Sequence, residues 1–266
     1  MRRLTAFSCA GEMLVGTIDD APGTAGLLIV SGGNELRIGS HRSMAELAAR
    51  LAAAGIPVFR YDRRGIGDST GDNGGFESTA DDIAAAAAAF RREVPHVTRV
   101  VGFGNCDAAA ALALFHAHGT FDGLVLSNPW VIDATAASDL PPPAAIRARY
   151  LDRLKDPRAL WRLATGGVNI VKLAKGLKSV AAGMSKVEGG LAQRFAEGLS
   201  TYPGKAVVLL CRLDNTAIAF REAWKGVAFA DLGPRIPVLE VDSASHSYQH
   251  PSDKEWLFAR LMDALR

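Results

Sequence analysis

Three side chains of types that suit nucleophilic catalysis follow one another along the chain, in the order Cys106, Asp214 and His246. A thiol can attack a carbonyl, an imidazole can take up and return the proton, and a carboxylate can orient that imidazole and stabilise its charge. Each of the three comes just after an apolar run that is typical of a buried strand. Because ligands of open parallel sheets bind beyond the carboxyl ends of the strands, the three side chains are expected to meet there.

The cysteine lies at a predicted corner between an apolar run and an alanine-rich helix. The stretch Gly104-Asn105-Cys106-Asp107-Ala108 matches the nucleophile elbow G-x-S-x-G, with cysteine for serine and alanine for the last glycine. Such a turn requires small flanking residues, and a thiol at a helix N-terminus is favoured as the reactive thiolate. This context favours the elbow over the ordinary alternative of a small cysteine buried in a core turn.

The acid and the base each have rivals in the sequence. Asp214 could simply cap the helix that follows it, and Asp133 and Asp242 also follow predicted strands. His250 is an alternative base, but His246 is preferred because it follows the last predicted strand directly. The order nucleophile, acid, histidine is that of the α/β-hydrolases and differs from the two common protease orders.

Backbone amides are the expected donors for an oxyanion that develops during attack. One is the N–H of Asp107, the residue after the nucleophile. The other is expected from Gly33 or Asn34, in the turn after the apolar run Gly26–Val30. Glycines after a buried strand are also ordinary turn residues, so that second assignment stays open.

The elements that must position these residues alternate along the chain, which predicts an α/β fold: a mainly parallel eight-stranded sheet with helices on both faces and a helical cap insertion. The core domain is expected to comprise residues 1–132 and 201–266, and residues 133–200 are expected to form the helical cap. The predicted strands are two in residues 3–18 and then 26–30, 56–61, 99–101, 123–129, 206–211 and 236–241; the predicted helices of the core are 43–54, 78–92, 107–118, 216–225 and 254–265.

Composition excludes several classes of function. A formal net charge of +2 gives no reason to expect nucleic acid as a partner, and no apolar run approaches membrane-spanning length. Three cysteines are too few for a disulfide framework or a zinc cluster, and two of them, Cys9 and Cys211, are expected in the core. The N-terminus reads as a first strand rather than an export signal, which predicts a cytoplasmic protein. Neither a metal nor another cofactor is expected.

The predicted cap is basic. Between Pro141 and Ser200 there are 11 Lys or Arg residues and 4 acids. A basic lid over a thiolate would attract an anionic substrate such as an acyl carrier, a phosphorylated lipid or an acidic glycan. A merely solvated basic helix surface is equally compatible with these counts, and residues 171–178 could also touch an anionic membrane surface.

Beyond the elbow, two stretches carry a narrower resemblance. They are Ser31–Arg42 and Arg60–Ser69. With Cys106-Asp107-Ala108-Ala109, they resemble the exosortase A system-associated hydrolase 1 family of the α/β-hydrolase superfamily. Ser31 stands where many α/β-hydrolases carry histidine before the oxyanion glycine.

This resemblance implies an α/β-hydrolase fold and a role in exosortase-linked exopolysaccharide biosynthesis. The leading hypothesis is a Cys-His-Asp enzyme that cleaves or transfers the acyl group of an ester or thioester, carried on a small molecule or a carrier. Two alternatives stay open, a dienelactone-hydrolase-like lactone hydrolase and a catalytically silent hydrolase-fold binding protein.

Overall fold

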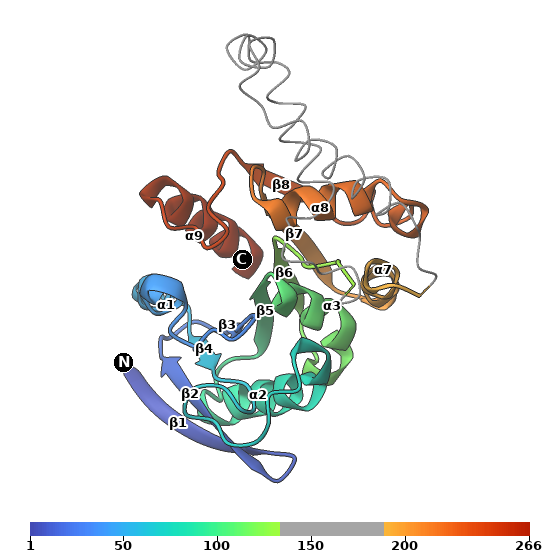
Figure 1. Cartoon of the computed structure of the whole chain (residues 1–266). Coiled ribbons are helices and arrows are strands. Elements are labelled where there is room, and N and C mark those ends of the chain that lie inside the picture. Colours follow the sequence, from blue (N-terminus) through green and yellow to red (C-terminus); the bar gives the residue numbers. More distant parts are fainter. Residues whose placement is uncertain (134–188) are drawn as a thin grey trace, which may run out of the picture.

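A computed structural model of the chain describes residues 1–133 and 189–266, which form an eight-stranded sheet flanked by helices (Figure 1). The strand order is β1-β2-β4-β3-β5-β6-β7-β8; β1 and β2 pair antiparallel, β2 pairs antiparallel with β4, and all later pairs are parallel. The strands are β1 Arg2–Cys9, β2 Glu12–Asp19, β3 Ala25–Val30, β4 Val58–Tyr61, β5 Arg99–Asn105, β6 Gly123–Ser127, β7 Lys205–Cys211 and β8 Val238–Val241. The predicted α/β fold class and all eight predicted strands are confirmed.

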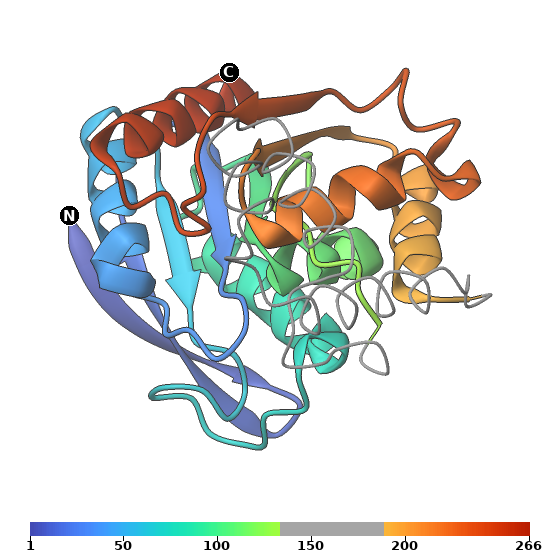
Figure 2. The same cartoon turned by 45° about the horizontal axis from the view of Figure 1, so that its top comes forward.

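The helices cover both faces of this sheet, as the alternation of strands and helices predicts (Figure 1, and the turned view in Figure 2). Helices α1 and α9 pack on one face, and α2, α3, α7 and α8 pack on the other. Their bounds are α1 Ser43–Ala53, α2 Ala80–Glu93, α3 Asp107–Gly119, α7 Leu191–Thr201, α8 Asn215–Trp224 and α9 Pro251–Leu265, with short 3-10 turns at Ser40–Arg42, Phe76–Ser78 and Val227–Phe229.

Packing against the sheet explains why alanine-rich segments form two of these helices. The alanines of α2 and α3 have strong helix propensity, and their small side chains let the helix backbone approach the strands closely. In α3, Ala108 through Ala111 are each at most 1% exposed, and they lie in the same buried cluster as Leu28 and Val30 of β3. The short side chains therefore seat the helix that follows Cys106 tightly on the sheet.

Most of the predicted cap, residues 134–188, lies outside the described residues, and so does most of its basic charge. The last helix in that predicted segment, α7, packs on the core, where Phe195 and Leu199 are fully buried. No helix in the described ranges is long and apolar enough to cross a bilayer.

Candidate active site

The predicted elbow is present between β5 and α3. Cys106 adopts φ 62° and ψ −125°, a backbone conformation that non-glycine residues rarely occupy. The turn is tight because α3 passes close to the strand: a Cβ added to Gly104 would lie 2.6 Å from the main-chain carbon of Ala108. The elbow therefore presents the thiol of Cys106 at the N-terminus of α3, and its side chain is partly exposed.

The three predicted catalytic side chains lie together at the elbow. His246 Nδ1 lies 3.0 Å from Asp214 Oδ2, and the same imidazole interacts with the side chain of Cys106 closely enough for that side chain to raise its pKa. Nδ1 donates to the carboxylate, which leaves the other ring nitrogen to face the sulfur. The structure thus brings Cys106, His246 and Asp214 together in the order that the sequence predicts.

Asp214 both caps α8 and contacts the histidine. Its Oδ2 accepts the N–H groups of Thr216 and Ala217, each at 3.1 Å, in addition to the bond from His246. The capping function considered in the sequence and the contact with the imidazole therefore hold at the same time. Three hydrogen bonds on one oxygen fix the carboxylate rigidly.

The rival residues are engaged elsewhere. Asp133 Oδ1 accepts the N–H of Leu191 at 2.7 Å at the start of α7. The exposed Asp242 pairs with Arg212 at 2.7 Å. His250 is exposed at the N-cap position of α9.

The environment of His246 favours the imidazolium form. Burial alone would lower the pKa of His246, but the hydrogen bonds and negative charges of Asp214 and Cys106 outweigh it and raise that pKa to about 10. At neutral pH the imidazole is therefore positively charged. An imidazolium held between a carboxylate and a sulfur is the arrangement that stabilises a thiolate.

The other two cysteines are core residues, as expected. Cys9 is 4% exposed and Cys211 is fully buried, and all three cysteines are unpaired. Burial, with Asp82 nearby, raises the pKa of the Cys9 thiol to about 12, and burial raises the pKa of the Cys211 thiol to about 11. Both stay protonated at neutral pH, so Cys106 differs from them in exposure and in having a cationic partner.

The expected oxyanion donors lie beside the thiol, with one unforeseen contact. Asp107 is the first residue of α3, so its N–H is among those with no acceptor within the helix. The N–H of Gly33, however, donates to Asp107 Oδ1 at 2.6 Å, and the carbonyl of Gly33 accepts a hydrogen bond from Arg63. The Asn34 side chain binds Asn73 at 2.9 Å. A carboxylate thus holds the N–H of Gly33, one of the two amides that the sequence offers as the second oxyanion donor.

Sequence reasoning did not single out a second carboxyl group near the imidazole. Although much of Glu35 is exposed, partial burial of its carboxyl group raises the pKa of Glu35, the positive charge of His246 opposes that shift, and Asp107 adds to it. Its position three residues after Gly32, in the turn after β3, is the only sequence signal that could have found it. The carboxyl group of Glu35 therefore lies close enough to the imidazole of His246 to feel its positive charge.

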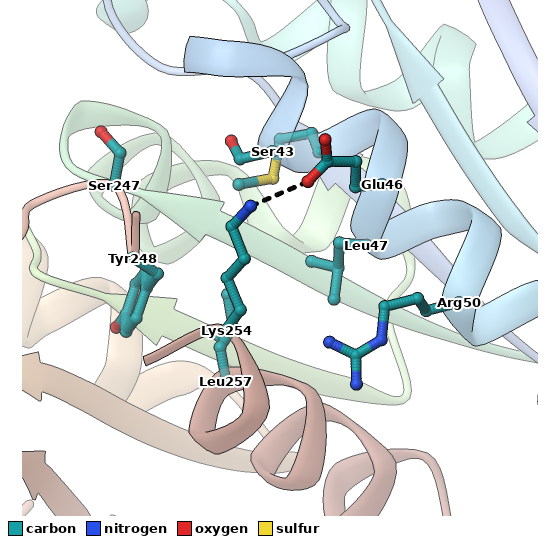
Figure 3. A pocket seen from close by; sticks show the side chains of 9 residues that line it. Ser43, Glu46, Leu47, Arg50, Ser247, Tyr248, Lys254 and Leu257 are labelled. Carbon is teal, nitrogen blue, oxygen red and sulfur yellow. Dashed lines mark hydrogen bonds and ion pairs between the residues drawn. The ribbon is translucent and has the colours of Figure 1, made fainter. Parts of the chain in front are cut away.

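Two hollows adjoin the site. One is lined by residues after β3 and at the end of β5, including Gly32, Glu35 and Asn105. The other lies between α1 and α9, where Lys254 binds Glu46 at 2.8 Å (Figure 3). The hollows share Ser43, Met44 and Ser247 in their linings. They are neighbours, and the first opens next to the elbow.

The described residues contain no group of three or more His, Cys, Asp or Glu side chains that could hold a metal ion.

Solved structures share this fold at low sequence identity. An esterase of Pyrococcus furiosus, Pf2001, superposes with a TM-score of 0.65 at 14% identity, over 100% of this chain and 94% of that chain. The α/β-hydrolase GrgF of Penicillium sp. sh18 gives a TM-score of 0.63 at 18% identity, over 100% and 98%. The thioesterase domain of the curacin biosynthetic pathway gives 0.59 at 13% identity, over 99% of each chain. These likenesses establish the α/β-hydrolase fold.

A search of curated proteins finds no match to this chain. The model of one family, described as serine aminopeptidase, S33, matches residues 24–178, which is more than half of the chain. That match spans the turn after β3 and the elbow, where this chain has cysteine rather than the serine of the family's name. The chain belongs to the serine aminopeptidase S33 family and is an α/β-hydrolase.

Proposed function

We propose that the protein is a cysteine-dependent hydrolase that cleaves or transfers the acyl group of an ester or thioester through an acyl-enzyme. The observation that supports this most is the meeting of Cys106, His246 and Asp214 at the carboxyl edge of the sheet, where the imidazole binds Asp214 and interacts with Cys106. In this proposal Cys106 is the nucleophile, His246 is the general acid and base, and Asp214 holds the imidazole in the correct tautomer.

The first half of the reaction breaks the substrate's acyl bond. The Cys106 thiolate attacks the carbonyl carbon, and the carbonyl electron pair moves to oxygen. As the tetrahedral intermediate collapses, His246 donates its proton to the departing alcohol or thiol. The product is a thioester between the acyl group and Cys106, with a neutral imidazole.

The second half regenerates the enzyme. The neutral imidazole of His246 removes a proton from water, or from an acceptor alcohol or thiol, which attacks the thioester carbonyl. Collapse expels the Cys106 thiolate, and the imidazole is again protonated. Water gives hydrolysis and any other acceptor gives acyl transfer, so both outcomes use the same residues.

The oxyanion needs two backbone donors in this mechanism. The N–H of Asp107 supplies one. The N–H of Gly33 supplies the other once the Asp107 carboxylate, which accepts that bond at 2.6 Å in the structure, rotates away. Loss of a single oxyanion donor typically costs about 10²–10³ in rate, so this rotation is part of the proposed cycle. Without this rotation the site lacks one oxyanion donor, which would favour the alternative of a catalytically silent binding protein.

The setting of the reaction is part of the same proposal. The resemblance of Ser31–Arg42 and Arg60–Ser69 to exosortase-associated hydrolases supports a role in exopolysaccharide assembly, with a small or carrier-linked, anionic acyl group as the proposed substrate. Three unpaired cysteines suit a reducing compartment, which supports a cytoplasmic location.

Trapping the acyl-enzyme tests the proposal. Wild-type protein is mixed with short-chain p-nitrophenyl esters or N-acetylcysteamine thioesters and quenched in acid. The protein is then digested, and the mass of the peptide that contains Cys106 is measured by mass spectrometry. We expect an acyl adduct on that peptide alone, and a loss of turnover of about 10⁴-fold or more in Cys106→Ala. Turnover in Cys106→Ala within tenfold of wild type, with the fold intact by circular dichroism, would rule out the cysteine as nucleophile. Lactones are tested in the same panel, and faster turnover of lactones than of esters and thioesters would favour the dienelactone-hydrolase-like alternative.

A further inference from the structure

The segment that carries His246 must reach back across the sheet to the thiol. It follows β8, which lies at the edge of the sheet and is separated from β5 by β6 and β7. At a strand spacing of about 4.8 Å, β8 and β5 are about 14 Å apart. The strand that leads into this segment is packed only in part, because Val238, Leu239 and Val241 of β8 are each partly buried, and the nearest buried side chain after His246 is Tyr248, two residues further on. Further contacts must therefore fix the position of the His246 imidazole.

Two side-chain amides bind the main chain of His246 itself. The carbonyl oxygen of His246 accepts one hydrogen bond from Asn105 Nδ2 at 3.2 Å and another from Asn128 Nδ2 at 3.3 Å. Asn128 Nδ2 also donates to Asn105 Oδ1 at 3.1 Å, so each amide orients the other. We name this pair the amide clamp. Asn105 directly precedes Cys106, so the clamp joins the histidine to the elbow.

The other end of Asn128 reaches the strand that leads to Asp214. Asn128 Oδ1 accepts the N–H of Cys211, the last residue of β7, at 2.7 Å. The residue is fully buried and its backbone has φ 39°, a conformation that asparagine tolerates better than most residues. One buried side chain thus contacts the segments that carry the thiol, the imidazole and the carboxylate.

We propose that Asn128, acting with Asn105, is a positioning residue that sets the distance between the imidazole of His246 and the sulfur of Cys106; this inference rests on the proposed function. The clamped carbonyl belongs to the histidine residue itself, so a shift of that carbonyl moves the ring. An error of about 1 Å in such a group can lower the rate about 10²-fold.

Other contacts of the segment hold its neighbours rather than the histidine. The Tyr248 hydroxyl lies 2.7 Å from Ser127 Oγ, and Ser243 Oγ donates to Asp253. These bonds fix the segment on either side of His246. Among the described residues, the amide clamp holds the catalytic residue's own backbone to the elbow.

The test uses three variants of the full chain. Asn128→Asp keeps the size of the side chain and the acceptor for Cys211, but it places a carboxylate oxygen where the donor to His246 stands. Asn105→Ala removes the other amide of the clamp. Because Asn105 is partly exposed, this variant can test the proposal even if Asn128→Asp fails to fold. The matched control is Tyr202→Phe, which deletes a buried 3.1 Å hydrogen bond to Phe121 far from the site.

Each variant is measured for melting temperature, for kcat and KM with a thioester, and for the pH dependence of Cys106 alkylation by iodoacetamide. Positioning predicts that both clamp variants lose about 10²-fold in kcat with little change in KM, and that alkylation in the neutral range falls. The charged groups that also interact with the imidazole, Asp214 and Glu35, are unchanged in all three variants. Tyr202→Phe is expected to lower only the melting temperature.

The outcomes separate this inference from the proposed function. If clamp variants that fold lower the melting temperature but keep the wild-type alkylation profile and kcat, the amides are merely structural and the inference is wrong. If wild-type Cys106 itself shows no enhanced alkylation and no acyl adduct, the proposed function fails first.

Discussion

The two sides of the candidate active site are built by different physical means. On the elbow side, Cys106 is placed by close packing: α3 approaches β5 so tightly that Gly104 has no room for a Cβ. On the opposite side, His246 stands in a polar segment after an edge strand and is placed by hydrogen bonds to Asp214, Asn105 and Asn128. Added side-chain volume should therefore destabilise the elbow. Loss of a hydrogen-bond donor or of a charge should instead displace the histidine segment and lower the rate.

The largest expected effect comes from the histidine side, in Asp214→Asn. Asparagine caps helices as well as aspartate does, so α8 and the melting temperature should change little. It cannot hold the imidazole as a charged acceptor, and we expect kcat to fall by about 10⁴-fold, as in other triads.

The matched control for this variant is Asp133→Asn, which changes another aspartate whose side chain accepts an N–H at the start of a helix, that of Leu191 in α7. We expect it to keep wild-type turnover. Equal losses in the two variants would show that capping, and not contact with the imidazole, explains the requirement for Asp214.

On the elbow side, Gly104→Ala tests the response to volume. The added Cβ would lie 2.6 Å from the main chain of Ala108, and neither backbone can move without disturbing the sheet or α3. We expect a loss of about 3 kcal/mol in the free energy of unfolding, measured by urea denaturation. Gly123→Ala, where the nearest atom is 3.4 Å away, is the control; a loss as large there would mean that the elbow is not specially tight.

The smallest expected effect lies between the two sides, at Asp107. Asp107→Asn keeps the shape of the side chain but removes the charge that strengthens its bond with the N–H of Gly33. The amide should then be freed more easily for the oxyanion, and we expect kcat/KM for an uncharged thioester to rise a few-fold. A fall in kcat/KM would show that the carboxylate assists the reaction and does not compete with the oxyanion.

The sequence predicted the packed side of the site better than the hydrogen-bonded side. Alternating apolar runs, a glycine before Cys106 and small residues after it are local signals, and they predicted the sheet and the elbow. The cap is predicted over residues 133–200, and most of it, residues 134–188, lies outside the described structure.

The contacts that the sequence did not reveal join residues far apart in the chain. Asn128 and His246 are 118 positions apart, and Gly33 and Asp107 are 74 apart. An asparagine or aspartate in a turn has many possible partners, so residue type alone could not pair them. The polar Asn128 directly after a fully buried strand was the one available signal.

The rate of iodoacetamide alkylation at each cysteine, measured by mass spectrometry from pH 5 to 10, tests the central claim most directly. Cys9 and Cys211 are buried thiols whose pKa values are raised to about 12 and about 11, so both should stay unreactive over most of this range. Cys106, paired with the imidazolium of His246, should react faster than both at pH 7 and lose that excess reactivity in His246→Gln. A Cys106 rate at pH 7 that is no higher than those of Cys9 and Cys211, or that is unchanged in His246→Gln, would contradict the account.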